Sequence, residues 1–160
     1  MKMNQSQQNV QTSVLDRLID DEPEASRESV SYRMTDFGRV KALVIRDLEN
    51  LLNSKSTMSP PPPAYRELNK SLYLYGLRDF TSLNPKSTSL RLQLSQEIKN
   101  KIQQFEPRLK NVIVTIEAPA EGERTVRFKI AGLLILDPLV EPVTFDTYFD
   151  ITRGNYSIPK

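Results

Sequence analysis

Three acidic residues in the second half of the chain could take part in acid–base chemistry: Glu106, Asp146 and Asp150. Two carboxyl groups at a suitable separation can hydrolyse a glycosidic bond, one as acid and the other as base or nucleophile. However, the alternation of residues around Asp146 and Asp150 predicts that both lie on the solvated face of a strand, and the chain has no Trp to stack on a sugar. A glycoside hydrolase is therefore only an alternative hypothesis.

Other kinds of active site lack the residues that they need. The 160 residues include no His and no Cys, which removes the thiolate nucleophile, two common metal ligands and the side chain that titrates nearest neutral pH. The run Asp20-Asp21-Glu22 lacks the alternating spacing of a calcium loop, and the five scattered glycines form no phosphate-binding loop. We therefore expect no enzymatic activity, no cofactor and no metal site.

Charge and hydropathy narrow the choice of partners. The chain has 22 basic and 20 acidic residues, a net charge of +2 and no block of like charges, so nucleic acid is a poor candidate partner. The stretch Met1–Val10 is too polar for a signal peptide, and the longest apolar run, Leu133–Leu136, is far too short to span a membrane. These features predict a cytoplasmic protein without membrane insertion.

The segment Glu106-Pro107-Arg108 brings two opposite charges close together. Proline pushes the preceding residue out of the helical region, and in an extended chain residues i and i+2 point the same way, so Glu106 and Arg108 should form a fork. Such a fork could bind a partner, or it could be a local ion pair at a helix end. Taken alone, the residues favour the local ion pair.

The elements that position these residues begin with helices. Residues 1–12 are polar enough to predict a disordered tail, which leaves 13–160 as a single domain. A short helix over 13–22 carries Leu15 and Leu18 on its apolar side and must pack on a core or a partner. A longer helix is predicted over 36–53, followed by a Pro-rich loop over 57–63 that includes a stiff run of four prolines.

Two further helices are predicted before the pattern changes. The first covers 64–75 and ends before Gly76 in the left-handed conformation, and the second runs from the hydroxyl cluster at 87–89 to Phe105, where Pro107 stops it. Beyond Pro107 the period becomes two, which predicts strands over 112–116, 126–136 with a bulge at Gly132, and 143–151, with a weaker one over 156–158. The order indicates an α+β fold, with N-terminal helices packed on a sheet of three to four mainly antiparallel strands.

Four short motifs occur in a particular order along the chain: Ser13-Val14-Leu15-Asp16-Arg17-Leu18, Arg46-Asp47-Leu48-Glu49-Asn50-Leu51-Leu52-Asn53, Tyr75-Gly76-Leu77-Arg78-Asp79 and Phe105-Glu106-Pro107-Arg108-Leu109. In this order they resemble the TssE family of type VI secretion baseplate proteins, which is grouped with the small baseplate wedge protein of contractile phage tails. The resemblance extends from Ser13 to Ile158.

The resemblance implies a cytoplasmic structural subunit at the membrane-docked baseplate, which joins TssF, TssG and TssK in the wedge and primes assembly of the contractile sheath. Members were once called lysozyme-like, so a peptidoglycan glycoside hydrolase is the alternative. The family associates the segment Glu106, Pro107 and Arg108 with baseplate contacts, which reverses the preference for a local ion pair. Leu15 and Leu18 are a second candidate contact with the wedge.

Sheath subunits could dock by adding a strand to an exposed sheet edge, since backbone hydrogen bonds then give affinity and alternating side chains give register. The third predicted strand is the most suitable edge, because no later strand of similar strength exists to cover it. Its residues Val143, Phe145, Thr147, Phe149 and Ile151 are therefore the expected sheath-binding set.

Overall fold

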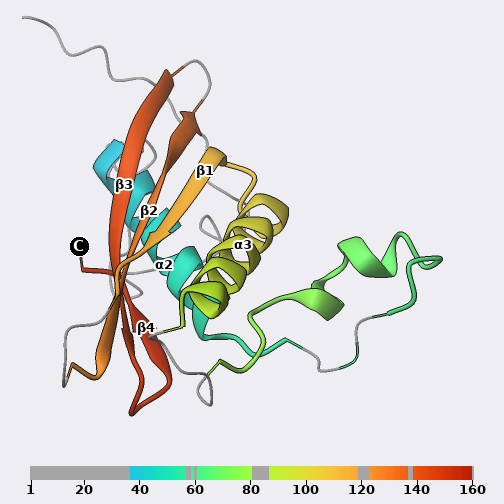
Figure 1. Cartoon of the computed structure of the whole chain (residues 1–160). Coiled ribbons are helices and arrows are strands. Elements are labelled where there is room, and N and C mark those ends of the chain that lie inside the picture. The colour runs from blue at the N-terminus through green and yellow to red at the C-terminus, as the bar shows by residue number, and fades with distance from the viewer. Residues whose placement is uncertain are drawn as a thin grey trace, which may run out of the picture. The chain divides into compact units, whose positions relative to one another are not determined.

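The computed structural model describes residues 37–56, 59, 61–80, 87–118, 123–136 and 139–159. In chain order the elements are α2 (Phe37–Asn53), the single-turn 3-10 helices η2 (Leu68–Lys70) and η3 (Leu72–Leu74), α3 (Thr88–Phe105), β1 (Leu109–Ile116), β2 (Thr125–Leu136), β3 (Leu139–Asp150) and β4 (Asn155–Ser157). Two helices pack on a four-stranded antiparallel sheet of order β1-β2-β3-β4, which confirms the predicted α+β fold (Figure 1). The boundary between two units of the chain falls between Val44 and Ile45, within α2.

Helix α2 forms where the apolar spacing predicts it. Most of its apolar residues are buried along one side, whereas Leu43 is half-buried. The buried side chains of the helix are Val40, Val44, Ile45, Leu48, Leu51 and Leu52. Their i, i+4, i+8 spacing keeps one side of the helix apolar over its whole length.

The sheet has one buried and one open face, as strict alternation along its strands requires. β2 and β3 pair from Thr125 opposite Asp150 to Leu136 opposite Leu139 without a shift in register. The inward side chains of these two strands include Val126, Phe128, Ile130, Val143, Phe145 and Phe149, all of which are buried. The side chains between them, such as Arg127, Lys129 and Asp146, are exposed on the opposite face.

A bulge interrupts the pairing of β1 with β2. The register shifts between Lys110 and Ile113, and Asn111 adopts the left-handed conformation with φ of 53°. Gly132 lies opposite, where a Cβ atom would come within 3.1 Å of the carbonyl oxygen of Lys110. The bulge predicted at Gly132 is thus carried by the partner strand, and the glycine provides the room that the bulge needs.

The helix predicted over 64–75 is wrong, because this segment contains only η2 and η3. Ser71 separates them with an extended backbone, ψ of 170°, and its hydroxyl accepts a hydrogen bond from the backbone N–H of Tyr73 at 3.2 Å. A serine that bonds to the nearby backbone competes with continued helix. The apolar residues give little opposing support, since Leu72 is 77% exposed and Tyr65 60% exposed.

Gly76 has the predicted positive φ, 95°, but it serves a tertiary contact and no α-helix ends at it. Leu77 donates its N–H to the carbonyl of Ser54 at 2.9 Å, and Ser56 donates to the carbonyl of Leu77 at 2.9 Å. A Cβ atom on Gly76 would be 2.4 Å from the oxygen of Ser54. Only glycine therefore allows the chain after η3 to return to the end of α2.

Some expectations concern residues that the structure does not describe. The tail over 1–12, the helix over 13–22 with Leu15 and Leu18, and the acidic run 20–22 all lie outside the described residues. Among the residues that are described, no helix is both long and apolar enough to cross a membrane.

Candidate functional site

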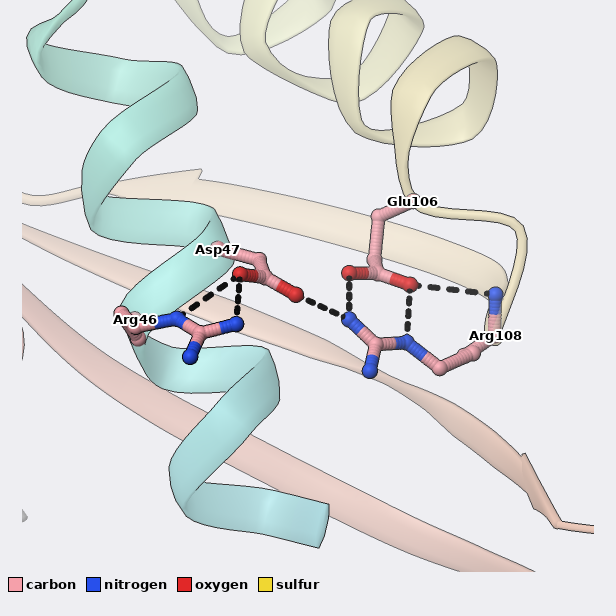
Figure 2. A network of polar contacts seen from close by, with 4 residues as sticks. All are labelled: Arg46, Asp47, Glu106 and Arg108. Carbon is pink, nitrogen blue, oxygen red and sulfur yellow. Dashed lines mark hydrogen bonds and ion pairs between the residues drawn. The ribbon is translucent and has the colours of Figure 1, made fainter. Parts of the chain in front are cut away.

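Glu106 and Arg108 lie together as predicted, and their side chains form an ion pair with each other (Figure 2). Arg108 donates to one carboxylate oxygen of Glu106 from Nε at 2.7 Å and from its backbone N–H at 3.2 Å, and to the other from Nη2 at 2.6 Å. A bidentate pair of this kind fixes the plane of the guanidinium group relative to that of the carboxylate group. Its charge-assisted hydrogen bonds are stronger than neutral ones. Glu106 therefore holds Arg108 in one orientation.

The network continues to helix α2, as Figure 2 shows. Nη2 of Arg108 also donates to Oδ2 of Asp47 at 2.6 Å. Arg46 donates to the other oxygen of Asp47 from Nε at 3.1 Å and from Nη2 at 2.9 Å. The four charges thus alternate in sign and tie α2 to the connection between α3 and β1.

A tight turn brings Glu106 and Arg108 together, and the chain there is not extended as the sequence suggested. Glu106 donates its N–H to Ile102 as the last bond of α3, and its carbonyl accepts from Leu109 at 3.1 Å. Pro107 is the exposed residue at this turn. Proline suits the position because it lacks an N–H that would need a partner.

Burial differs sharply between the two members of the fork. The Glu106 side chain is 5% exposed and that of Arg108 is 24% exposed. Hydrogen bonding to Glu106 raises the pKa of Arg108 above its ordinary value against the effect of burial, and the charges of Glu106 and Asp47 add to the rise. Arg108 and Pro107, and not Glu106, are therefore the members of this segment that an incoming molecule can reach.

Aromatic packing supports the same junction. The rings of Tyr75 and Phe105 meet edge to face with centroids 5.2 Å apart. Burial, and then the charges of Asp47 and Glu106, raise the pKa of Tyr75 above its ordinary value. Lys101 anchors the neighbouring segment by donating to the carbonyl of Leu74, and burial lowers its pKa. The third sequence motif is thus fixed against α3.

A second joint ties α2 to the C-terminal strand. The side chain of Asn53 donates to the carbonyl of Tyr156 at 2.9 Å and accepts from its N–H at 2.8 Å. Glu49 accepts from the N–H of Ile158 at 2.7 Å. Because these backbone groups point away from β3, the outer edge of β4 is covered by the side chains of Asn53 and Glu49.

The part of the β3 edge that extends beyond β4 has no strand paired with it among the described residues. Ile151 donates to Arg124 on the β2 side, and the carbonyl of Asp150 accepts from Gly154 on the β4 side. With the regular register, every even-numbered residue of β3 therefore points its backbone groups away from β2. β4 pairs only with Tyr148, Phe149 and Asp150, so the backbone groups of Val140, Thr144 and Asp146 have no partner strand among the described residues.

Four of the five residues predicted for sheath docking lie in this strand, where they alternate with the outward positions. The side chains of Val143, Phe145, Thr147 and Phe149 are buried in the core, and their backbone groups face β2. Ile151 lies in the turn after β3 and outside the strand. Pro142 has an exposed side chain and occupies an outward position, where its missing N–H costs no bond to β2.

The three carboxylates considered for hydrolysis do not converge. Glu106 is bound on both oxygens by Arg108, whereas Asp146 lies on the open face of the sheet opposite Lys129. The side chain of Asp150 accepts from the backbone N–H of Thr152 at 2.8 Å and of Arg153 at 3.1 Å and so stabilises the turn after β3. The described part of the chain also holds no group of three or more acidic residues arranged to bind a metal ion.

Sequence reasoning missed the partners that lie far along the chain. Asp47, Glu49 and Asn53 all belong to the second motif, and each makes a different tertiary contact. In the third motif Arg78 binds Glu97 of α3 through Nε at 2.8 Å, Nη2 at 2.5 Å and its backbone N–H at 3.1 Å. Polar residues clustered in one short motif were the available signal, although the sequence could not show what they bind.

The described residues form a small α+β domain in which polar and charged contacts join two helices to a sheet, and part of the β3 edge has no partner strand among these residues, features that suit an assembly module. The sequence model of the baseplate wedge protein gp25 matches residues 38–139, so the chain belongs to this family and has a structural role in a baseplate. No curated protein sequence matches the chain. A solved chain described as "The baseplate complex from the type VI secretion system" is similar, with 19% identity and a TM-score of 0.47 over 69% of this chain and 94% of that one.

Proposed function

We propose that the protein is the wedge subunit of a type VI secretion baseplate, where it joins TssF, TssG and TssK and primes assembly of the contractile sheath. Membership of the wedge family supports the structural half of this proposal. The order of the four motifs, which resembles TssE, favours a secretion system over a phage tail. In such a system the protein works in the cytoplasm, at the membrane-docked baseplate, and has no enzymatic role.

The unpaired edge of β3 is the single observation that carries the sheath-priming role. A strand added there would bond to Val140, Thr144 and Asp146, whose backbone groups point away from β2. Strand addition positions a partner with little demand on side-chain identity. A rigid subunit with such an edge can therefore set the position and orientation of the first sheath ring.

The Arg108 network supports the wedge contact. Pro107 and the exposed quarter of the Arg108 side chain would meet the neighbouring subunit, while Glu106 and Asp47 hold the guanidinium in place beforehand. An arginine fixed before binding loses less rotamer entropy when the contact forms. Leu15 and Leu18 remain candidates for a second wedge contact.

Co-purification with TssF and TssG tests the wedge contact. Arg108→Ala should reduce the recovered complex, while Lys110→Ala, which removes an exposed cation nearby on β1, should leave it unchanged. Circular dichroism and urea unfolding must show that the Arg108→Ala monomer is folded. Equal recovery of wild type and a folded Arg108→Ala variant would place the wedge contact elsewhere.

Sheath assembly on purified baseplates tests the other half of the proposal. Baseplates that contain the wild-type chain should start sheath polymers, and those that lack it should not. If the two preparations start sheath equally well, the priming role is lost while the structural role in the baseplate remains.

A further inference from the structure

The geometry of β3 shows why its edge stays open. β4 ends at Ser157, which pairs with Tyr148. If β4 continued in the same register, Pro159 would lie opposite Asp146 at a position where an N–H must be donated. Proline has none, so the chain's own last strand cannot extend along β3. Among the described residues no strand pairs with the outer side of the stretch from Val140 to Asp146, so this stretch is open to a strand from another molecule.

The open face of the sheet beside this stretch is apolar at one end. Ile113 is 64% exposed and pairs with Ala131, which in turn pairs with Thr144. Val140 is 51% exposed and pairs with Ile135. An added strand would place its own side chains directly next to these rows and extend them.

The other end of the stretch carries a charge. Asp146 is exposed and lies opposite Lys129 in β2, whose far neighbour in β1 is Thr115. On its free side Asp146 has no cross-strand neighbour among the described residues. A basic side chain there would face a carboxylate, whereas an acidic one would meet a like charge.

We propose that the β3 edge selects an extended segment with a defined side-chain pattern: a basic residue opposite Asp146, followed at alternate positions by apolar residues that pass Thr144, Pro142 and Val140. This inference rests on the proposed function, in which the edge takes a strand, and adds the chemistry of the partner. The residue opposite Pro142 gives its N–H to the proline carbonyl and receives no hydrogen bond in return. Selectivity therefore lies at the two ends of the stretch.

Short blocked peptides test the pattern on the full chain. The first alternates Val and Thr and begins with Lys, the second carries Glu in place of Lys, and both are titrated into ¹⁵N-labelled protein. The Lys peptide should bind about fivefold more tightly than the Glu peptide, which is the scale of a favourable cross-strand pair against a repulsive one. Binding should also protect the amides of Thr144 and Asp146 from hydrogen exchange.

Charge reversal gives the matched control. Asp146→Lys should invert the preference between the two peptides, and Asp146→Asn should abolish it, while both variants keep the peptide-dependent protection of Thr144. Since Asp146 is exposed, both substitutions leave the core untouched. Unfolding curves in urea verify that the variants are folded.

The outcomes distinguish the proposed docking edge from the proposed side-chain pattern of its partner. If both peptides protect Thr144 but bind equally well to every variant, the pattern is overturned and the docking edge stands. If no peptide protects Thr144, or if its amide is already protected in the free protein, the edge is not a docking site and the pattern falls with it.

Discussion

Arg108 donates three hydrogen bonds to the carboxylate of Glu106, two residues before it, and a fourth to Asp47, 61 residues before it. The local bonds shape the turn after α3, while the distant one fixes that turn against α2. A contact that joins two elements through one guanidinium should matter for stability as well as for binding.

Replacing the acceptor of this arginine should destabilise the isolated protein. Glu106→Gln keeps the shape but removes a buried charge that faces a cation, so we expect a loss of about 2 kcal/mol in the free energy of unfolding. Urea unfolding at neutral pH measures it. Lys55→Gln, which removes the charge of an exposed side chain paired with Asp79 at 3.5 Å, is the control and should cost under about 0.5 kcal/mol. If Glu106→Gln costs no more free energy of unfolding than the control, Glu106 does not stabilise the fold.

Gly76→Ala should be more damaging than an ordinary surface change. The new Cβ would clash with the oxygen of Ser54 in a backbone conformation that favours glycine, so we expect a loss of roughly 2 to 3 kcal/mol. The amide of Leu77, which bonds to Ser54, should lose protection from hydrogen exchange. Gly154→Asn is the control, because Asn tolerates a φ of 66° in a turn. Unchanged stability in Gly76→Ala would contradict the close approach.

Asn53→Ala should loosen β4 and expose its outer edge. The substitution removes the donor and the acceptor that bind the backbone of Tyr156, at an expected cost of about 1 to 3 kcal/mol. An uncovered edge also promotes pairing between copies, so light scattering should detect self-association. Asn53→Asp keeps the acceptor for the N–H of Tyr156 and should show a smaller change. A monomeric Asn53→Ala variant of full stability would rule out this role.

Tyr156 should make the protein less stable in alkali. Burial, followed by the charges of Glu97 and Asp79, raises the pKa of its phenol above the ordinary 10.0. The folded state thus holds the proton more tightly than the unfolded state, so this stability is complete below about pH 10 and declines as the pH rises further. Tyr156→Phe should flatten the decline, while Tyr73→Phe, at a half-exposed ring, should not.

The same substitution tests the buried hydroxyl near neutral pH. Oη of Tyr156 is buried and has no hydrogen-bond partner among the described residues. Its removal should therefore leave stability unchanged or raise it slightly, because no bond is lost and a desolvated polar group disappears. A loss of more than about 1 kcal/mol at pH 7 in urea unfolding would mean that the hydroxyl is bonded in solution.

Thr144→Pro should separate folding from sheath docking. Residue 144 points its N–H away from β2, so proline removes no bond of the sheet but takes away a donor from the free edge. We expect a folded monomer that fails to bind sheath subunits in a sedimentation assay, with Thr144→Val, which retains the N–H, as the control. A proline variant that binds sheath normally would move the docking edge elsewhere.

Much of the fold follows from periodicity. Apolar residues recur at helical spacing in α2 and α3 and alternate in β1 to β3, over lengths at which burial decides between helix and strand. Pro107 separates the helical part of the chain from the strands. Residues 64–75 misled because Leu68 and Leu72 sit at helical spacing yet are 40% and 77% exposed. These side chains cover no apolar surface, so their spacing did not produce a helix. The hydroxyl of Ser71 bonds to the nearby backbone and separates the two short turns.

The site could be predicted only in its local part. Proline at 107 was enough to place Glu106 beside Arg108, although the geometry is a turn. Asp47 could not be assigned as their partner, because no rule of spacing connects residues on separate elements. The residues expected at the docking edge alternate with the outward positions of β3, since alternation shows which side chains are buried and not which neighbour the backbone faces.

Polar side chains from a helix contact each end of the sheet. β4 is capped from α2 by Asn53 and Glu49, and the helix α3 meets β1 through Ser95, whose hydroxyl bonds to the carbonyl of Val114 at 2.6 Å. The stretch of β3 from Val140 to Asp146 has no such cover among the described residues, so a visiting strand would meet free backbone groups there. If sheath docks there as proposed, each wedge protein would recruit one sheath subunit along β3, and the number of wedges would set the number of subunits that start the first ring.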